Sequence, residues 1–172
     1  MTFILTYGIL TLFDTRPSQL NGSTGSSRAA QESHAMIISL LPPAIANLDF
    51  SRLRQKLMDP TDGLGLSLTE LDKAEREYRR FLAMHKHHPS APLVPNRLVD
   101  AFWHAHILDT QRYSTDCLAV FGYVLHHDPY VGIDGPESVK VLESMFAQTK
   151  ALYESLFGPY PSQELEAMRC KG

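Results

Sequence analysis

The segment from Val99 to Cys117 concentrates side chains that can bind metals or transfer protons. Its sequence, "VDAFWHAHILDTQRYSTDC", holds a tryptophan, two histidines, a tyrosine, a cysteine and several aspartates. Imidazole, carboxylate, phenol and thiol groups are the side chains that most often ligate metals or act as acids and bases. This segment and the "HHDPY" that follows it therefore carry the candidate functional site.

The two histidines of the "WHAH" stretch point to different sides of the helix that we predict here. At about 100° per residue, His104 and His106 lie about 160° apart, so they cannot chelate one ion while the helix is regular. Asp100 precedes His104 by one turn, the spacing at which a carboxylate holds the second nitrogen of an imidazole. His106 lies in an apolar stripe, where Asp109 and Tyr113 are the predicted polar partners.

A second pair of histidines, His126 and His127, follows the predicted helix. Because consecutive residues point in different directions, we expect at most one of the two to face the core. His104 or His106 could combine with this residue and with a carboxylate or Cys117 to bind a metal. Two or three histidines with a carboxylate suit Zn²⁺ or non-haem Fe²⁺, whereas an added thiolate favours Zn²⁺ or copper.

The leading hypothesis from the enzyme class is a small metal-dependent enzyme that acts on a small-molecule substrate. The cofactor would be one transition-metal ion (Zn, Fe or Cu). Its candidate ligands are His104 and one of the neighbouring pair His126 and His127. The predicted supporting and pocket residues are Asp100, which would orient His104, and Trp103, His106, Asp109, Tyr113 and Cys117.

The competing hypothesis is a non-catalytic binding or interaction domain with a protein partner. In that case the histidines form a structural hydrogen-bond network, and Trp103, Tyr113 and Cys117 are ordinary core residues. The sequence has no HExxH motif, glycine-rich phosphate loop, GxSxG elbow or CxxC motif to decide between the two hypotheses. Cys117 is predicted to face inward, which argues against a role as nucleophile.

The run from Leu93 to Gly135 resembles the glycine-rich domain-containing protein-like family. The shared pattern is an Asp, a Trp-His-x-His, a Tyr, an Asp-Cys and a later histidine pair. The matching residues are Asp100, Trp103, His104, His106, Tyr113, Asp116, Cys117, His126 and His127. The resemblance extends over about residues 48–160 and is to the short bacterial-type members, because this sequence contains no glycine-rich tail. It implies relatives, not a particular activity.

Helices are expected to position these residues. Apolar residues recur at helical spacing in four segments, which are residues 49–58, 67–88, 96–122 and 136–157. Ser67 and Glu70 have capping-box spacing, and Gly122 is well placed to end the central helix in the left-handed conformation. Sustained period-two alternation is missing from the sequence. We therefore predict an all-α, compact bundle of about four helices with a long central helix.

Three further histidines close the second predicted helix. His85, His87 and His88 stand in its last turn, where imidazoles suit the negative end of the helix dipole. We favour capping and solvation for them, with metal binding as the alternative.

Length and composition set the remaining limits. The 172 residues, 44% of them hydrophobic, suit one domain at 36–162, and the net charge of −3 favours neither nucleic acid nor a membrane surface as partner. Two cysteines predict a reducing, cytoplasmic setting. Residues 1–35 are predicted to be a flexible tail or non-native extension, with a poor signal peptide as the alternative, and 163–172 a C-terminal tail.

Overall fold

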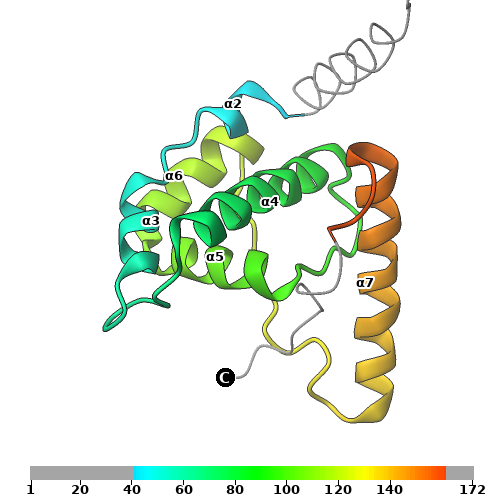
Figure 1. Ribbon diagram of the computed structural model, residues 1–172. Coiled ribbons are helices and arrows are strands. Elements are labelled where there is room, and N and C mark those ends of the chain that lie inside the picture. The colour runs from blue at the N-terminus through cyan, green and yellow to red at the C-terminus, as the bar shows by residue number, and fades with distance from the viewer. Residues whose placement is uncertain (1–40, 162–172) are drawn as a thin grey trace, which may run out of the picture.

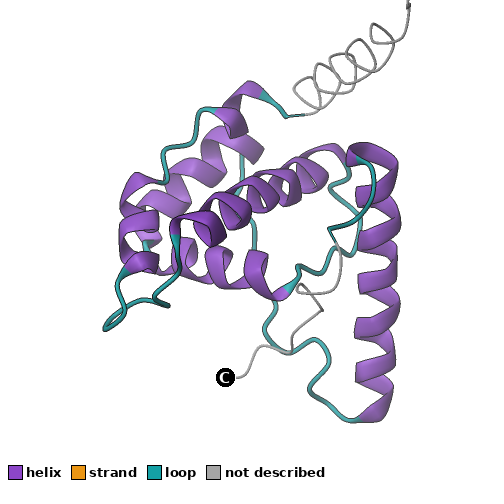
Figure 2. Cartoon of the chain, in the orientation of Figure 1, coloured by secondary structure: helices purple, strands orange, loops and turns teal. Residues whose placement is uncertain are grey.

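The computed structural model describes residues 41–161, and this part of the chain consists of helices and loops (Figure 2). The helices are α2 (Pro43–Ala46), α3 (Ser51–Met58), α4 (Leu68–His87), α5 (Arg97–Leu108), α6 (Thr110–Phe121) and α7 (Pro136–Phe157). The predicted all-α class is confirmed. The tails predicted at residues 1–35 and 163–172 lie outside the described residues, so their boundaries stay predictions.

Local sequence signals determine where these helices begin and end. The Ser67 hydroxyl accepts the Glu70 backbone N–H at 3.3 Å, and the Glu70 carboxylate accepts the Ser67 backbone N–H at 2.9 Å. This capping box starts α4 as predicted. At the end of α6, Gly122 has φ +82°, a conformation that glycine adopts without steric cost. Pro136 occupies the first turn of α7, where its missing N–H is tolerated.

Asp109 divides the predicted central helix into two. Its φ and ψ of −84° and 71° lie outside the helical region, and its carboxylate accepts the Arg112 backbone N–H at 3.4 Å. Aspartate is a favoured N-cap because such a bond satisfies a free donor of the first turn. The structure therefore replaces the long central helix with α5 and α6, which run in different directions in Figure 1.

The core forms where α4 and α5 cross, with α3 beside them (Figure 1). Phe50, Tyr78 and Phe102 meet there at ring-centroid distances of 5.6, 5.4 and 5.3 Å. All three side chains are buried. A fixed aromatic core of this kind holds the helices that carry the candidate site in one arrangement.

Helix α7 lies along one side of the molecule, next to the C-terminal part of α4 (Figure 1). The Tyr153 hydroxyl of α7 donates to the buried Glu77 carboxylate of α4 at 2.7 Å. The Val94 backbone N–H donates to the Thr149 hydroxyl at 2.9 Å. These bonds attach α7 to the rest of the fold. Among residues 41–161, no helix combines the length and the apolar character needed to cross a membrane.

Candidate metal centre

Three potential ligands converge beside α5. Asp100 and His104 lie one turn apart on this helix, and His127 reaches them from the loop that follows α6. The Nε2 atoms of His104 and His127 are 3.1 Å apart. The Oδ1 atom of Asp100 lies 3.3 Å from His127 Nε2 and 3.7 Å from His104 Nε2. Each residue thus offers one donor atom to the same point in space.

These separations suit three ligands of one ion. Bonds of about 2.1 Å place tetrahedral ligand atoms about 3.4 Å apart, and octahedral neighbours about 3.0 Å apart. The three observed separations, 3.1, 3.3 and 3.7 Å, fall around these values. The donor set of Asp100, His104 and His127 therefore fits a transition metal without rearrangement of the backbone.

One side of the cluster is open. The His104 side chain is 42% exposed, whereas those of Asp100 and His127 are 13% and 12% exposed. Asp100 and His104 also line a cleft of about 810 Å³ between α3, the loop after it and α5. We call this the α3–α5 cleft. A small molecule in the cleft could contact the donor atoms directly.

Buried side chains position His127. The Trp103 ring packs edge-on against the His127 ring, with centroids 4.7 Å apart. The Trp103 indole N–H donates to the Tyr113 hydroxyl at 2.9 Å, and that hydroxyl donates in turn to the Leu125 carbonyl. Since Leu125 is two residues before His127, this chain of bonds holds the loop that delivers the third donor.

Two other predicted site residues, His126 and Cys117, lie outside the cluster. His126 is exposed and stands outside the group of converging donors, so the histidine pair contributes one member only. Cys117 is buried, and burial raises the pKa of its thiol, which keeps it protonated. Such a thiol does not match the low pKa that a nucleophilic cysteine needs.

His106 belongs to a separate, buried network. Its Nδ1 lies 3.0 Å from the hydroxyl of Tyr78, a partner that the sequence interpretation missed in favour of Asp109 and Tyr113. Its Nε2 lies 3.3 Å from Asp116 Oδ2 but is not directed at it for a hydrogen bond. Burial lowers the pKa of His106, and the Asp116 carboxylate opposes this effect. The imidazole is therefore held neutral within the core.

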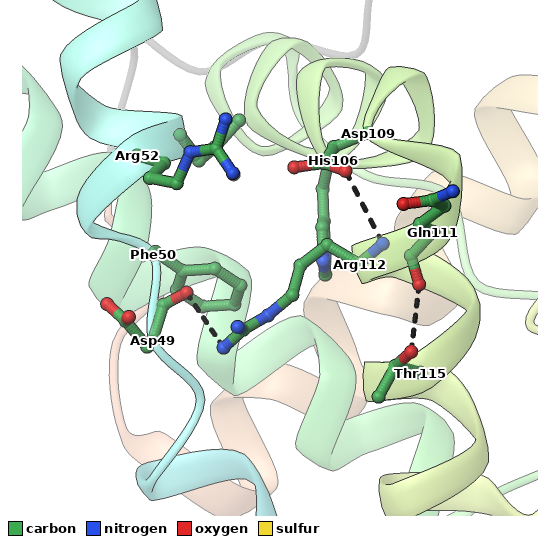
Figure 3. Close-up of a pocket in the computed structure, with 9 residues that line it drawn as sticks. Asp49, Phe50, Arg52, His106, Asp109, Gln111, Arg112 and Thr115 are labelled. Carbon is green, nitrogen blue, oxygen red and sulfur yellow. Dashed lines mark hydrogen bonds between the residues drawn. The ribbon is translucent and has the colours of Figure 1, made fainter.

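A smaller cavity of about 320 Å³ adjoins this network. Figure 3 shows Phe50 and Arg52 on one side of it and His106 and Arg112 on the other. The Arg112 guanidinium binds the Asp49 carbonyl at 3.3 Å and the Asp116 carboxylate at 3.1 Å. The Arg112 side chain of α6 thus holds the segment that precedes α3.

The histidines at the end of α4 behave differently from one another. His87 and His88 are exposed, as the solvated interpretation predicts. His85 is half-buried: its ring packs edge-on against Phe81 at a centroid distance of 4.7 Å and lies near Trp103. Burial lowers the pKa of His85 to about 4. Its position on α4, four residues after Phe81, turns the ring toward the core.

The fold and this cluster define, for the described residues, an all-helical protein with a candidate two-histidine, one-carboxylate metal centre. Residues 44–147 match the UCP032817-like family, and the chain belongs to that family. It is also similar to glycine-rich domain-containing protein 1 of Arabidopsis thaliana, with 34% identity over 92 residues. That similarity covers 51% of this chain and 11% of the plant protein, and it agrees with the resemblance found in the central motif. No solved structure matches the chain significantly.

Arg97, a charged residue of the cleft, is not among the predicted site residues. Arg97, Asp100, His104 and Leu108 follow one another at spacings of three, four and four residues, which places them on one face of α5. All four line the α3–α5 cleft. Helical periodicity applied to charged residues would have assigned Arg97 to the site.

Proposed function

We propose that this protein is a small metal-dependent enzyme whose ion is held by Asp100, His104 and His127. The observation that supports this most strongly is the convergence of three donor atoms at the edge of a cleft. Catalytic metal sites commonly use three protein ligands and leave a further position for water or substrate. Structural zinc sites are instead closed by four protein ligands.

The donor chemistry narrows the choice of metal. Two imidazoles and one carboxylate suit Zn²⁺ and non-haem Fe²⁺. The Cys117 thiol, which would have favoured Zn²⁺ or copper, is not in the group of converging donors. A bound ion of this kind polarises a substrate oxygen or lowers the pKa of a bound water. The chain contributes the ligands, the wall of the cleft and the buried support behind His127.

A hydrogen-bond network without metal is the competing function for the same residues. His127 Nε2 lies within hydrogen-bond distance of both His104 and Asp100, so a proton could link them. In that case the domain binds a partner without catalysis. The proposal also includes a cytoplasmic location and no nucleic-acid or membrane partner, which the small negative charge and the two cysteines support.

Titration of metal-stripped full-length protein with Zn²⁺, and anaerobically with Fe²⁺, tests the proposal. We expect calorimetry to show about one site and thermal unfolding to shift upward on binding. His104→Ala and Asp100→Ala should abolish the site, whereas Asp134→Ala, which removes an exposed carboxylate outside the cleft, should keep it. Equal binding by Asp100→Ala and wild type, or no binding by wild type, would overturn the proposal in favour of the network.

A further inference from the structure

We infer that the α3–α5 cleft binds an amphipathic organic anion, with a carboxylate or phosphate head group next to the metal and an apolar body along the cleft. The inference rests on the proposed metal centre, because the head group is expected to reach the open coordination position. Three features of the cleft support the inference. They are two arginines that form no ion pair within residues 41–161, exposed leucines, and the order of the cleft residues along α5.

Two arginines of the cleft are available to bind an anion. Three carboxylates line the cleft, and each already interacts with another group of the protein. Asp62 lies 4.0 Å from Lys56, Asp109 caps the positive end of α6, and Asp100 belongs to the donor cluster. Within residues 41–161, Arg52 and Arg97 of the same cleft form no ion pair. A guanidinium in this setting is suited to bind a carboxylate or phosphate with two parallel hydrogen bonds.

A divalent ion would make the charge of the cleft positive, because the three cationic side chains and three carboxylates that line it balance without the ion. The donor cluster supplies one carboxylate and two imidazoles, which are neutral when they ligate a metal. The loaded centre would therefore carry a net charge of about +1, because two positive charges meet one negative charge. An anionic head group is the complement of this centre and of the neighbouring guanidiniums.

The remaining wall of the cleft is apolar. Leu108 is 82% exposed, the highest value of any large hydrophobic side chain in the described residues, and Leu64 is 57% exposed. Leu53 and Leu57 of α3 and Ala101 and Ala105 of α5 extend this wall. A ligand with an apolar body would remove these side chains from water, and the volume of about 810 Å³ lies in the range of small-molecule sites.

The order of residues along α5 gives the ligand a direction. Arg97 lies one turn before Asp100, and His104 lies one turn after it. Leu108 stands at the other end of the same face, one further turn along. A head group at the metal is thus within reach of Arg97, while the apolar body extends toward Leu108.

Binding of octanoate to Co²⁺-loaded full-length protein tests this inference. Octan-1-ol has the same apolar body without the charge, and acetate has the same head group without the body. We expect octanoate to bind at least about tenfold more tightly than either, because each lacks one of the two interactions. Octanoate should also change the visible absorption spectrum of Co²⁺. Octyl phosphate in a parallel series shows which head group is preferred.

Variants identify the surface that binds. Arg97→Gln should weaken octanoate binding about tenfold, with Co²⁺ uptake unchanged, and Leu108→Ala should weaken octanoate but not acetate. Lys86→Gln and Leu118→Ala replace exposed residues outside the cleft and should leave binding unchanged. Metal-loaded protein that binds octanoate no better than octan-1-ol, or equally with and without metal, would overturn the inference. Failure to take up Co²⁺ would instead overturn the proposed function.

Discussion

The Nε2 atoms of His104 and His127 lie 3.1 Å apart, although the residues are 23 positions apart in the chain. Two imidazole nitrogens at this distance share either a proton or an ion. The Asp100 carboxylate lies 3.3 Å from one of them and 3.7 Å from the other. An ion would use all three atoms as ligands, whereas without an ion a single proton on His127 would be shared between His104 and Asp100.

Tyr113 should control metal affinity without touching the metal. Its hydroxyl joins the Trp103 indole to the Leu125 carbonyl, so Tyr113→Phe releases the loop that carries His127. We expect the Zn²⁺ dissociation constant to rise at least about tenfold, as is typical when a supporting residue is lost. Calorimetric titration of both proteins with Zn²⁺ measures this dissociation constant. Tyr130→Phe is the matched control, because that side chain is 67% exposed. Equal affinities for Tyr113→Phe and wild type would refute this role.

Tyr78 should affect stability but not metal binding. Its fully buried hydroxyl lies 3.0 Å from His106 Nδ1, so Tyr78→Phe leaves a buried nitrogen without a partner. The expected cost is about 1–3 kcal/mol in the free energy of unfolding by urea, with metal stoichiometry unchanged. Tyr123→Phe, at an exposed position, should cost little. Loss of the metal in Tyr78→Phe would show that the two histidine groups are coupled, contrary to our account.

Asp109 separates α5 from α6 by capping α6. Asp109→Ala removes the acceptor for the Arg112 backbone N–H and should destabilise the protein by about 1 kcal/mol. Asp109→Asn keeps an oxygen acceptor and should retain most of the stability. Urea unfolding of the two variants compares them directly. If both were equally stable, the cap would not be what holds this helix boundary.

His85 should make the protein less stable in acid. Burial lowers its pKa in the folded state to about 4, below its ordinary value of 6.5, so the unfolded chain binds more protons between these values. Stability should therefore fall as the pH is lowered from 6.5 toward 4, by up to roughly 3 kcal/mol from this residue. His85→Phe should reduce this dependence, whereas His88→Ala, at an exposed position, should not. An unchanged pH profile in His85→Phe would mean that the ring is solvated.

Sequence signals predicted the local features of the fold well. The capping box of Ser67 and Glu70 and the left-handed Gly122 depend on neighbouring residues only, so their spacing was sufficient. The break at Asp109 was missed because its neighbours continue the helical pattern, and the competing cap is a single side chain. The hydrogen bond from the Arg112 backbone to the Asp109 side chain competes with continuation of the helix. The free-energy difference between the two is small, and the spacing of apolar residues does not reveal it.

The candidate site was harder to predict than the fold. The pairing of Asp100 with His104 follows from a one-turn spacing, and the structure places them 3.7 Å apart. The choice between His126 and His127 depends on where the loop turns, which the Trp103 and Tyr113 side chains decide across the core. Long-range contacts of this type are not encoded in any local spacing. Tyr78, the partner of His106 from a different helix, was missed for the same reason.

Metal content of the full-length protein, purified without a histidine tag and measured by elemental analysis, is the most direct test of the central claim. We predict about one equivalent of zinc or iron in the wild type and in His126→Ala, and its loss in His127→Ala with the fold retained. The two variants remove adjacent imidazoles, only one of which joins the cluster. Equal metal content in the two variants, or none in the wild type, would contradict the account.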